Sequence, residues 1–161
     1  MRTSDVTKQM ILRKAEDSDK TAIRTLLESV ALPTESIGNG TTTFYLAEEK
    51  GNLLGIAGFE FYGDDALLRS VAVPPQIQNK GIGDGIVDSM IVLARERNIK
   101  RIVLLTETAE GFFRKKGFKT VDRSSIGNES MNRSSEFTTA CPTSAVCMIM
   151  ELIATQAVSK L

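Results

Sequence analysis

The stretch from Val71 to Gly83 constrains the fold more than any other part of this sequence. It begins as an apolar strand pattern, passes through a turn that contains Gly81, and opens a helix whose apolar residues recur at helical spacing to about Glu96. Glycines at such a turn let the backbone approach a ligand, and the N–H groups of the first helical turn point at the same place. The sequence therefore predicts an anion-binding loop between a strand and a helix.

Two familiar phosphate loops do not fit this stretch. A Walker-type loop ends in Gly-Lys-Ser/Thr, whereas Gly81 is followed by Ile82. A dinucleotide fingerprint needs glycines at places one, three and six, but the glycines here stand at places one, three and five, with Ile86 at the sixth. The spacing argues against both nucleoside triphosphate hydrolysis and dinucleotide binding.

The rest of the chain alternates between strand and helix patterns. Apolar and β-branched runs predict strands over 10–13, 42–48, 53–62, 66–73, 101–106, 118–121 and 145–152. Helices are expected after the N-cap candidates Asp17, Ser18 and Asp19, over 81–96, and over 109–116, where Gly117 suits the left-handed position that ends a helix. The polar segment 122–144 is too long for a simple hairpin loop, so it should contain a short helix or a folded lid. This order predicts an α/β sheet with helices on its faces.

Composition bounds the function classes. The 161 residues suffice for a single domain, 1–161, in which 1–8 should be disordered. Charges balance at 20 basic and 20 acidic residues, which disfavours nucleic acid and membrane partners. No run is long enough to span a bilayer and the polar start lacks a signal-peptide core, so a cytoplasmic location is expected. With no histidine and two cysteines, His-based triads are excluded and no metal is expected.

The sequence Gln78-Asn79-Lys80-Gly81-Ile82-Gly83 resembles the acyl-CoA loop of the GNAT superfamily of N-acetyltransferases, which reads Gln/Arg, two residues, Gly, one residue, Gly/Ala. The preceding strand, the following helix, the strand 102–106 and the segment 109–118 occur in the family's order, so the resemblance covers roughly 10–152. It implies a mixed, mostly antiparallel sheet of six or seven strands with helices on both faces, splayed at the acyl-CoA site. It also implies an acyltransferase with acetyl-CoA as its co-substrate.

The resemblance assigns roles to the cofactor-binding residues. Backbone amides of the loop would hold the CoA pyrophosphate; these residues are Gln78, Asn79, Lys80, Gly81, Ile82 and Gly83. Main-chain groups of Val71, Ala72 and Val73 would pair with the pantetheine amides as an added strand does, beside the strand 102–106. Phe113 would line the cofactor, and it stands where many family members carry a tyrosine that protonates the departing sulfur.

The acid and base of the reaction depart from the family pattern. A thiolate is a tolerable leaving group, so activity does not require the missing tyrosine, and water, Ser70 or Thr106 could serve instead. The glutamate often found on the strand before the loop is replaced by Leu67, and Glu60 on the neighbouring strand is the nearest substitute. Alternatively, Glu60 is an ordinary strand carboxylate that faces solvent. The catalytic candidates are therefore Glu60 and Thr106, with Glu107 a weaker one.

The substrate candidates are Arg69 and Ser70. A forked cation in an apolar strand suits an anionic head such as a carboxylate, phosphinate or arsonate, but a structural ion pair would explain Arg69 equally well. The stretches 67–70, 104–106, 108–113, 136–137 and 141–145 also resemble a GNAT subgroup associated with arsenic-resistance gene clusters. They suggest an acceptor that is a small amine, with an anionic arsenic- or phosphorus-containing amino acid as one candidate.

Other functions remain open at this level. The absent tyrosine and glutamate would also fit a non-catalytic acyl-CoA-binding or metalloid-sensing module, for which Cys141 is a thiol candidate. Acetylation of a protein N-terminus or lysine is a third reading. A homodimer is compatible with the sequence, since dimers are the commonest symmetric assemblies.

Overall fold

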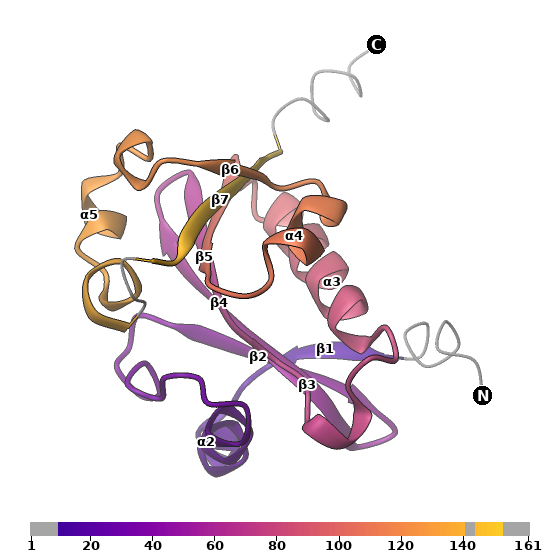
Figure 1. Cartoon of the computed structure of the whole chain (residues 1–161). Helices are drawn as coiled ribbons and strands as arrows, with labels where there is room; N and C mark the ends of the chain where they lie inside the picture. The colour runs from indigo at the N-terminus through magenta and orange to yellow at the C-terminus, as the bar shows by residue number, and fades with distance from the viewer. Residues whose placement is uncertain (1–9, 141–143, 153–161) are drawn as a thin grey trace. The chain divides into compact units, whose positions relative to one another are not determined.

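The computed structural model describes residues 10–140 and 144–152, so the predicted disorder of 1–8 and the proposed role of Cys141 lie outside the described residues. The elements, shown in Figure 1, are β1 (Ile11–Lys14), η1 (Asp17–Asp19), α2 (Lys20–Ser29), β2 (Thr43–Glu49), β3 (Asn52–Tyr62), β4 (Asp65–Ala72), η2 (Pro75–Ile77), α3 (Ile82–Glu96), β5 (Arg101–Thr106), α4 (Glu110–Lys116), β6 (Lys119–Val121), η3 (Arg123–Ser125), α5 (Glu129–Asn132), η4 (Glu136–Ala140) and β7 (Val146–Glu151).

The seven strands form one sheet in the order β1-β2-β3-β4-β5-β7-β6. Neighbours β1 and β2, β2 and β3, β5 and β7, and β6 and β7 run antiparallel, whereas β4 and β5 run parallel. The parallel register joins Asp65–Leu67 to Arg101–Val103, and on its other side β5 pairs with β7 along its whole length, Arg101–Thr106. The predicted mixed, mostly antiparallel, open sheet is confirmed, with seven strands.

The backbone contacts divide the chain into two compact units. The first comprises Met1–Glu60 and Ser70–Leu93, and the second comprises Phe61–Arg69 and Ala94–Leu161. The expectation that 1–161 acts as a single acetyltransferase domain stays a prediction.

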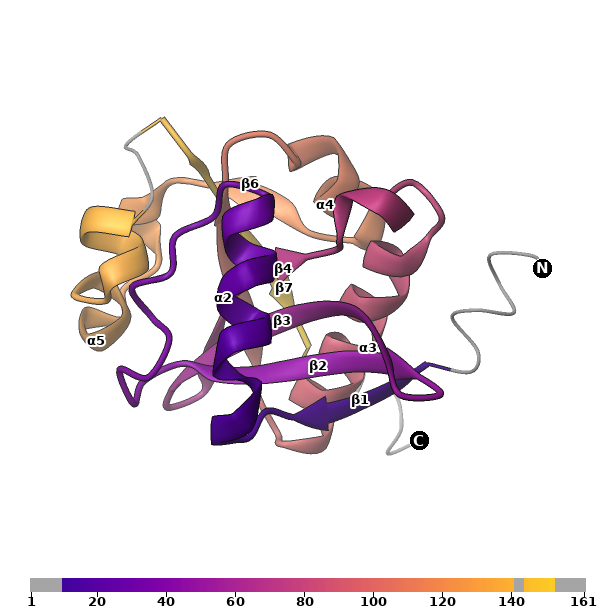
Figure 2. The same cartoon turned by 90° about the horizontal axis from the view of Figure 1, so that it is seen from below.

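In the first unit, α2 covers one face of the sheet. Its buried residues Ile23, Leu26 and Leu27 lie on one face of the helix and pack against Phe44, Leu46, Ile56 and Ala72. Figure 2 shows α2 lying across β2 and β3. Alternation along β2 and β3 gives this face its apolar side chains, so burial rather than helix propensity holds α2 in place.

The other face of the same strands is covered by α3, and Gly55 permits its close approach. A Cβ atom at Gly55 would lie 2.5 Å from Ile86 Cδ1 of α3 and 2.7 Å from the Ala72 carbonyl oxygen. Glycine inside a strand often marks such a contact. The beginning of α3 is therefore seated directly against β3 and the end of β4.

In the second unit, β5 and β7 carry the core. Leu67, Val103, Leu105, Cys147 and Ile149 pack with residues from the segment after β6, namely Ile126 and Met131. That segment contains η3, α5 and η4, which confirms the predicted short helix.

A polar network fastens the start of this segment. Asn128 caps α5, because its Oδ1 accepts a 3.1 Å hydrogen bond from the Met131 amide. The Asn128 Nδ2 donates to the Tyr62 carbonyl oxygen at 3.0 Å and to Asp65 Oδ2 at 2.9 Å. Arg101 donates to the same carboxylate at 2.8 and 3.0 Å and to the Ile126 carbonyl oxygen at 2.8 Å. Buried polar groups satisfied in this way fix the segment to β4 and β5.

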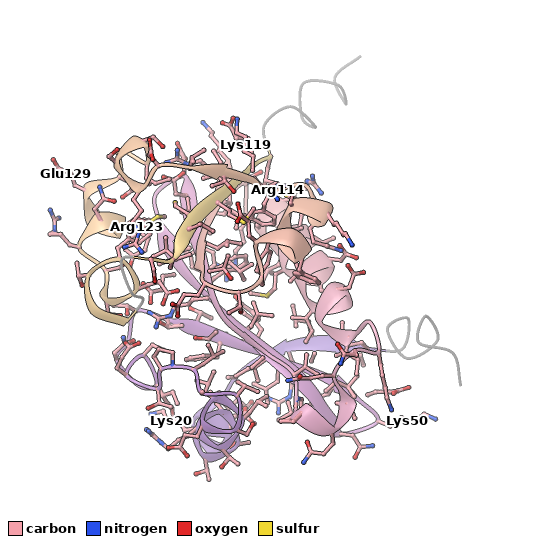
Figure 3. All side chains as sticks on the ribbon, in the orientation of Figure 1. Lys20, Lys50, Arg114, Lys119, Arg123 and Glu129 are labelled. Atoms are coloured by element: carbon pink, nitrogen blue, oxygen red, sulfur yellow. The ribbon has the colours of Figure 1, made fainter. Side chains whose placement is uncertain are left out.

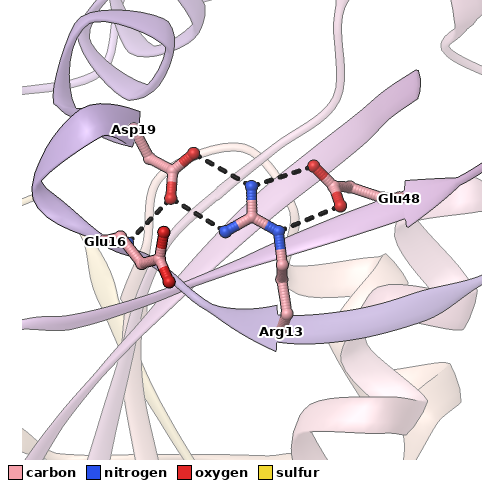
Figure 4. A network of polar contacts seen from close by, with 4 residues as sticks. All are labelled: Arg13, Glu16, Asp19 and Glu48. Carbon is pink, nitrogen blue, oxygen red and sulfur yellow. Dashed lines mark hydrogen bonds and ion pairs between the residues drawn. The ribbon is translucent and has the colours of Figure 1, made fainter. Parts of the chain in front are cut away.

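Two details at helix ends test the expected caps. Gly117 has φ +108° and ends α4 in the left-handed conformation, as predicted. Asp19 stands at the N-cap of α2, one of the three candidate positions, but the expected hydrogen bond from its side chain to that helix is absent. Its carboxylate instead binds Arg13 at 2.8 and 2.9 Å and the Glu16 amide at 2.7 Å, as Figure 4 shows. These bonds, the one from Arg13 first, lower the pKa of Asp19 to about 2.

No helix within the described ranges is long and apolar enough to cross a membrane.

Candidate active site

The predicted anion loop joins β4 to α3 in the first unit. Gln78 folds back so that its Nε2 donates a 2.9 Å hydrogen bond to the Val73 carbonyl oxygen. Asn79 and Gly81 have φ values of +65° and +82°, and α3 begins at Ile82. Two left-handed residues turn the chain sharply into the helix, which is the conformation that favours glycine at Gly81.

The loop presents its backbone to solvent while one side chain anchors it. Gln78, Asn79, Lys80 and Gly81 are exposed, whereas Ile82 is only 4% exposed and enters the core. At Gly83, a Cβ atom would meet its nearest neighbour, Val73 Cγ2, at 3.9 Å, so space is open on this side of the first helical turn. Accessible amides at the positive end of a helix of 15 residues suit a phosphate group.

The strand that leads into the loop is irregular at Ser70. This residue has φ +59°, although it lies inside β4 and is not glycine. Such a conformation costs free energy and is commonest at functional sites. Ser70 is half-buried, as are Val71 and Val73, while Ala72 is buried. The strand pattern of the sequence gave no sign of this distortion.

Glu60 is buried at the end of β3, with 2% of its surface exposed. It accepts a 2.6 Å hydrogen bond from Thr42 Oγ1, so it is not the solvated carboxylate that was its alternative. Thr42 was not among the candidates, although it began the predicted strand 42–48, because the residue that it faces depends on the strand register. The hairpin at Lys50 and Gly51 could have suggested the pairing, but a bulge between Ala47 and Glu48 shifts the register.

Arg69 is also buried, with 3% of its surface exposed. Its Nη2 lies 3.2 Å from Glu136 Oε1, and its Nη1 donates to Ser135 Oγ at 3.1 Å. The structural ion pair considered as its alternative therefore exists. A role for Arg69 and Ser70 in binding substrate stays a prediction.

The remaining candidates lie in the second unit. Thr106 Oγ1 accepts a 3.0 Å hydrogen bond from the Ala109 amide, which fixes the turn before α4. Phe113 is 8% exposed, and its ring packs edge to face with Phe112 at 5.0 Å and with Phe118 at 5.5 Å between centroids. The Thr106 hydroxyl thus keeps its own hydrogen for donation, while Phe113 contributes only apolar surface.

The groups that bind metals are not assembled among the residues described. No cluster of three or more cysteine, aspartate or glutamate side chains occurs within 10–140 and 144–152. Cys147 is a buried free thiol, and burial raises its pKa to about 11.

Comparison with known proteins identifies this arrangement. The model of the Acetyltransferase (GNAT) domain family matches residues 40–120. The chain is 29% identical to an uncharacterized N-acetyltransferase of Chlorobaculum tepidum over 120 residues, 70% of this chain and 77% of that protein. It is 28% identical to an amino-acid acetyltransferase of Mycobacterium tuberculosis over 129 residues, 74% of each chain.

Solved structures agree on the fold. N-acetylglutamate synthase of Neisseria gonorrhoeae, complexed with coenzyme A and N-acetyl-glutamate, superposes with a TM-score of 0.73 at 22% identity and 89% coverage of this chain. This chain spans only 35% of that protein. A Mycobacterium tuberculosis protein in complex with CoA gives a TM-score of 0.71 at 26% identity, with 88% of this chain and 99% of that chain covered.

Proposed function

Because this chain belongs to the GNAT family of N-acetyltransferases, we propose that it transfers the acetyl group of acetyl-CoA to the amine of a small amino acid. The observation that carries the proposal is the loop from Gln78 to Gly83, with its left-handed turn, its exposed backbone and its position at the start of α3. The pyrophosphate of acetyl-CoA would bind the loop amides, with Lys80 adding positive charge. Main-chain groups of Val71–Val73 would bind the pantetheine arm.

The chemistry needs a neutral amine, an activated carbonyl and a leaving thiolate. The amine nitrogen attacks the thioester carbon, a C–N bond forms, the C–S bond breaks, and the amine gives up a proton. Glu60 is the proposed base, supported by its burial and by its hydrogen bond from Thr42. Thr106 is the proposed donor to the departing sulfur, since its hydroxyl hydrogen is not used in the bond from Ala109. Phe113 would line the cofactor.

The acceptor class is supported by the relatives. One relative of this chain is named amino-acid acetyltransferase, and an N-acetylglutamate synthase of similar fold was solved with N-acetyl-glutamate. A relative named as a putative ribosomal-protein alanine N-acetyltransferase, from Bacillus subtilis, is 25% identical over 89 residues, so acetylation of a protein N-terminus is the second candidate. The subgroup resemblance adds an arsenic- or phosphorus-containing amino acid to the panel worth testing.

The test measures thiol release from acetyl-CoA with a panel of amino acids, polyamines, aminoglycosides, arsenical amino acids and N-terminal peptides. A matched pair of variants examines the loop. Gly81→Ala and Gly51→Ala both place alanine at φ +82°, so both should lose similar stability. Only Gly81→Ala should raise the acetyl-CoA dissociation constant, by about tenfold or more. Equal acetyl-CoA binding by the two variants would overturn the loop assignment, and no thiol release with any acceptor would overturn the activity.

A further inference from the structure

A pocket of about 290 Å³ opens in the first unit, where β1 ends, α2 begins and β2 starts. Its floor is apolar, since Ile23 and Phe44 are 2% and 6% exposed. The residues that line it are Lys14, Ala15, Glu16, Asp17, Lys20, Ile23, Ile37, Gly38, Gly40, Thr42, Thr43 and Phe44. None of these residues belongs to the acetyl-CoA loop, and the sequence analysis did not predict the pocket.

Charges of both signs stand around the apolar floor. Lys20, labelled on α2 in Figure 3, lies 3.6 Å from Asp17 in an exposed pair that contributes little stability. Lys14 is exposed and has no ion-pair partner within the described part of the chain. Two ammonium groups beside an apolar surface suit the carboxylate of a small molecule that also carries apolar carbon.

The walls of the pocket are held in place by hydrogen bonds. In Figure 4, the fork of Arg13 joins Asp19 at the start of α2 to Glu48 of β2, at 2.8 to 3.0 Å. In the loop that carries the lining residues Gly38 and Gly40, Asn39 Oδ1 accepts from the Thr41 and Thr42 amides at 3.0 and 3.3 Å. These contacts restrain the segments that line the pocket, and a restrained pocket lowers the entropic cost of binding.

One lining residue connects the pocket to the buried carboxylate. Thr42 directs its hydroxyl hydrogen to Glu60 at 2.6 Å, which leaves the lone pairs of Thr42 Oγ1 able to accept a hydrogen bond from a ligand. An ammonium group is the natural donor for this oxygen. The pocket thus offers a place for both ends of an α-amino acid.

We infer that this pocket binds the acceptor as an α-amino acid, with its carboxylate at Lys14 and Lys20 and its ammonium at Thr42. The inference rests on the proposed function. An ammonium proton passes to Thr42 Oγ1 as Thr42 gives its own proton to Glu60, which leaves a neutral amine and a protonated carboxyl. Lys14 and Lys20, which line the pocket, supply the cations that the carboxylate of the acceptor requires.

The first test compares an amino acid with its decarboxylated amine. The best amino-acid acceptor of the panel is used with Lys14→Ala, Lys20→Ala and, as a control, the exposed Lys119→Ala. The two pocket variants should raise KM for the amino acid about tenfold, leave KM for acetyl-CoA unchanged and leave KM for the decarboxylated amine unchanged. Lys119→Ala should change none of these. An equal effect on both acceptors, or no effect, would overturn the carboxylate site.

The second test examines the proton path. Thr42→Val removes the hydroxyl at nearly constant volume and should lower kcat at pH 7, with the loss shrinking at alkaline pH as more of the free amine is already neutral. Thr42→Ser should restore most of kcat. A uniform loss at all pH values, with no rescue by serine, would show a merely structural role for Thr42.

Binding of amino acids in the absence of acetyl-CoA distinguishes the proposed pocket from the proposed acetyltransferase activity. Calorimetry with L-leucine and with 3-methylbutylamine should detect L-leucine alone, and Lys14→Ala should weaken that binding. This result without any acetyl transfer would support the pocket and overturn the proposed function. Acetyl transfer to amino acids with unaltered KM in both lysine variants would overturn the pocket and support the proposed function.

Discussion

Replacing Gly55 by alanine should destabilise the packing of α3 against β3 and the end of β4. The added Cβ atom would lie 2.5 Å from Ile86 Cδ1 and 2.7 Å from the Ala72 carbonyl oxygen. Ile86 can move the end of its side chain, but the carbonyl is backbone and immediately precedes Val73, which accepts the hydrogen bond from Gln78. The strain of such overpacking is about 1–3 kcal/mol. At roughly 2–4 °C per kcal/mol for a chain of this size, Tm should fall by several degrees.

The assay is thermal unfolding with and without acetyl-CoA, beside a control that makes the same exchange. Gly111 lies in α4 with nothing within 4 Å of a Cβ atom. Gly111→Ala should keep or raise Tm, because alanine is favoured over glycine in a helix by up to about 1 kcal/mol. Gly55→Ala should also reduce the stabilisation that acetyl-CoA confers. A Tm for Gly55→Ala at or above that of the natural chain would refute the close approach of α3 to β3.

Three further perturbations test the electrostatics. Changing either Arg69 or Glu136 to methionine should cost about 3–5 kcal/mol in urea unfolding, since each leaves a buried charge without its ion pair, and the double change should recover most of it. Asp19 has a pKa of about 2, below its unfolded value, so its stabilising effect holds at neutral pH and is lost as the pH falls from about 5 toward 2. Acid unfolding of an Arg13→Met variant should lack that part of the pH dependence. Cys147, with a pKa of about 11, should resist thiol reagents at pH 8 until the chain unfolds, and fast labelling of the native chain would contradict its burial.

Periodicity predicted the elements that bury a regular face. The apolar spacing in α2 and α3 and the β-rich runs of β2 and β3 reflect which residues leave water, and the bounds of α3, β2 and β3 agree with the sequence to within about two residues. The left-handed end of α4 at Gly117 followed from glycine's lack of a Cβ atom. These features depend on residues that are close together in the sequence, so the sequence alone predicts them.

Contacts between distant residues could not be predicted in the same way. Asp19 was expected to cap α2, but strand pairing brings Arg13 and Glu48 close to it, and its carboxylate binds the Arg13 guanidinium and the Glu16 amide instead of an amide of α2. Glu60 is bound by Thr42, which lies 18 positions before it in the sequence. Arg69 pairs with Glu136, which lies 67 positions after it. A bulge in the β2–β3 register and the irregular segment after β6 decide those pairings, and neither has a periodic pattern.

Because Phe113 replaces the tyrosine of many family members, protonation of the leaving thiolate and deprotonation of the acceptor amine must be considered separately. A thiolate leaves without prior protonation near neutral pH, because a free thiol has a pKa near 8.5, whereas an aliphatic amine is almost fully protonated there. The difficult proton is therefore the one on the acceptor, and an enzyme can omit the acid more easily than the base. The proposed base, Glu60, is a buried carboxylate that accepts a 2.6 Å hydrogen bond from Thr42 at the wall of a pocket, which is the arrangement such a proton transfer requires. On this argument, selection acting on Glu60 and Thr42 should be stronger than on any hydroxyl near the departing sulfur.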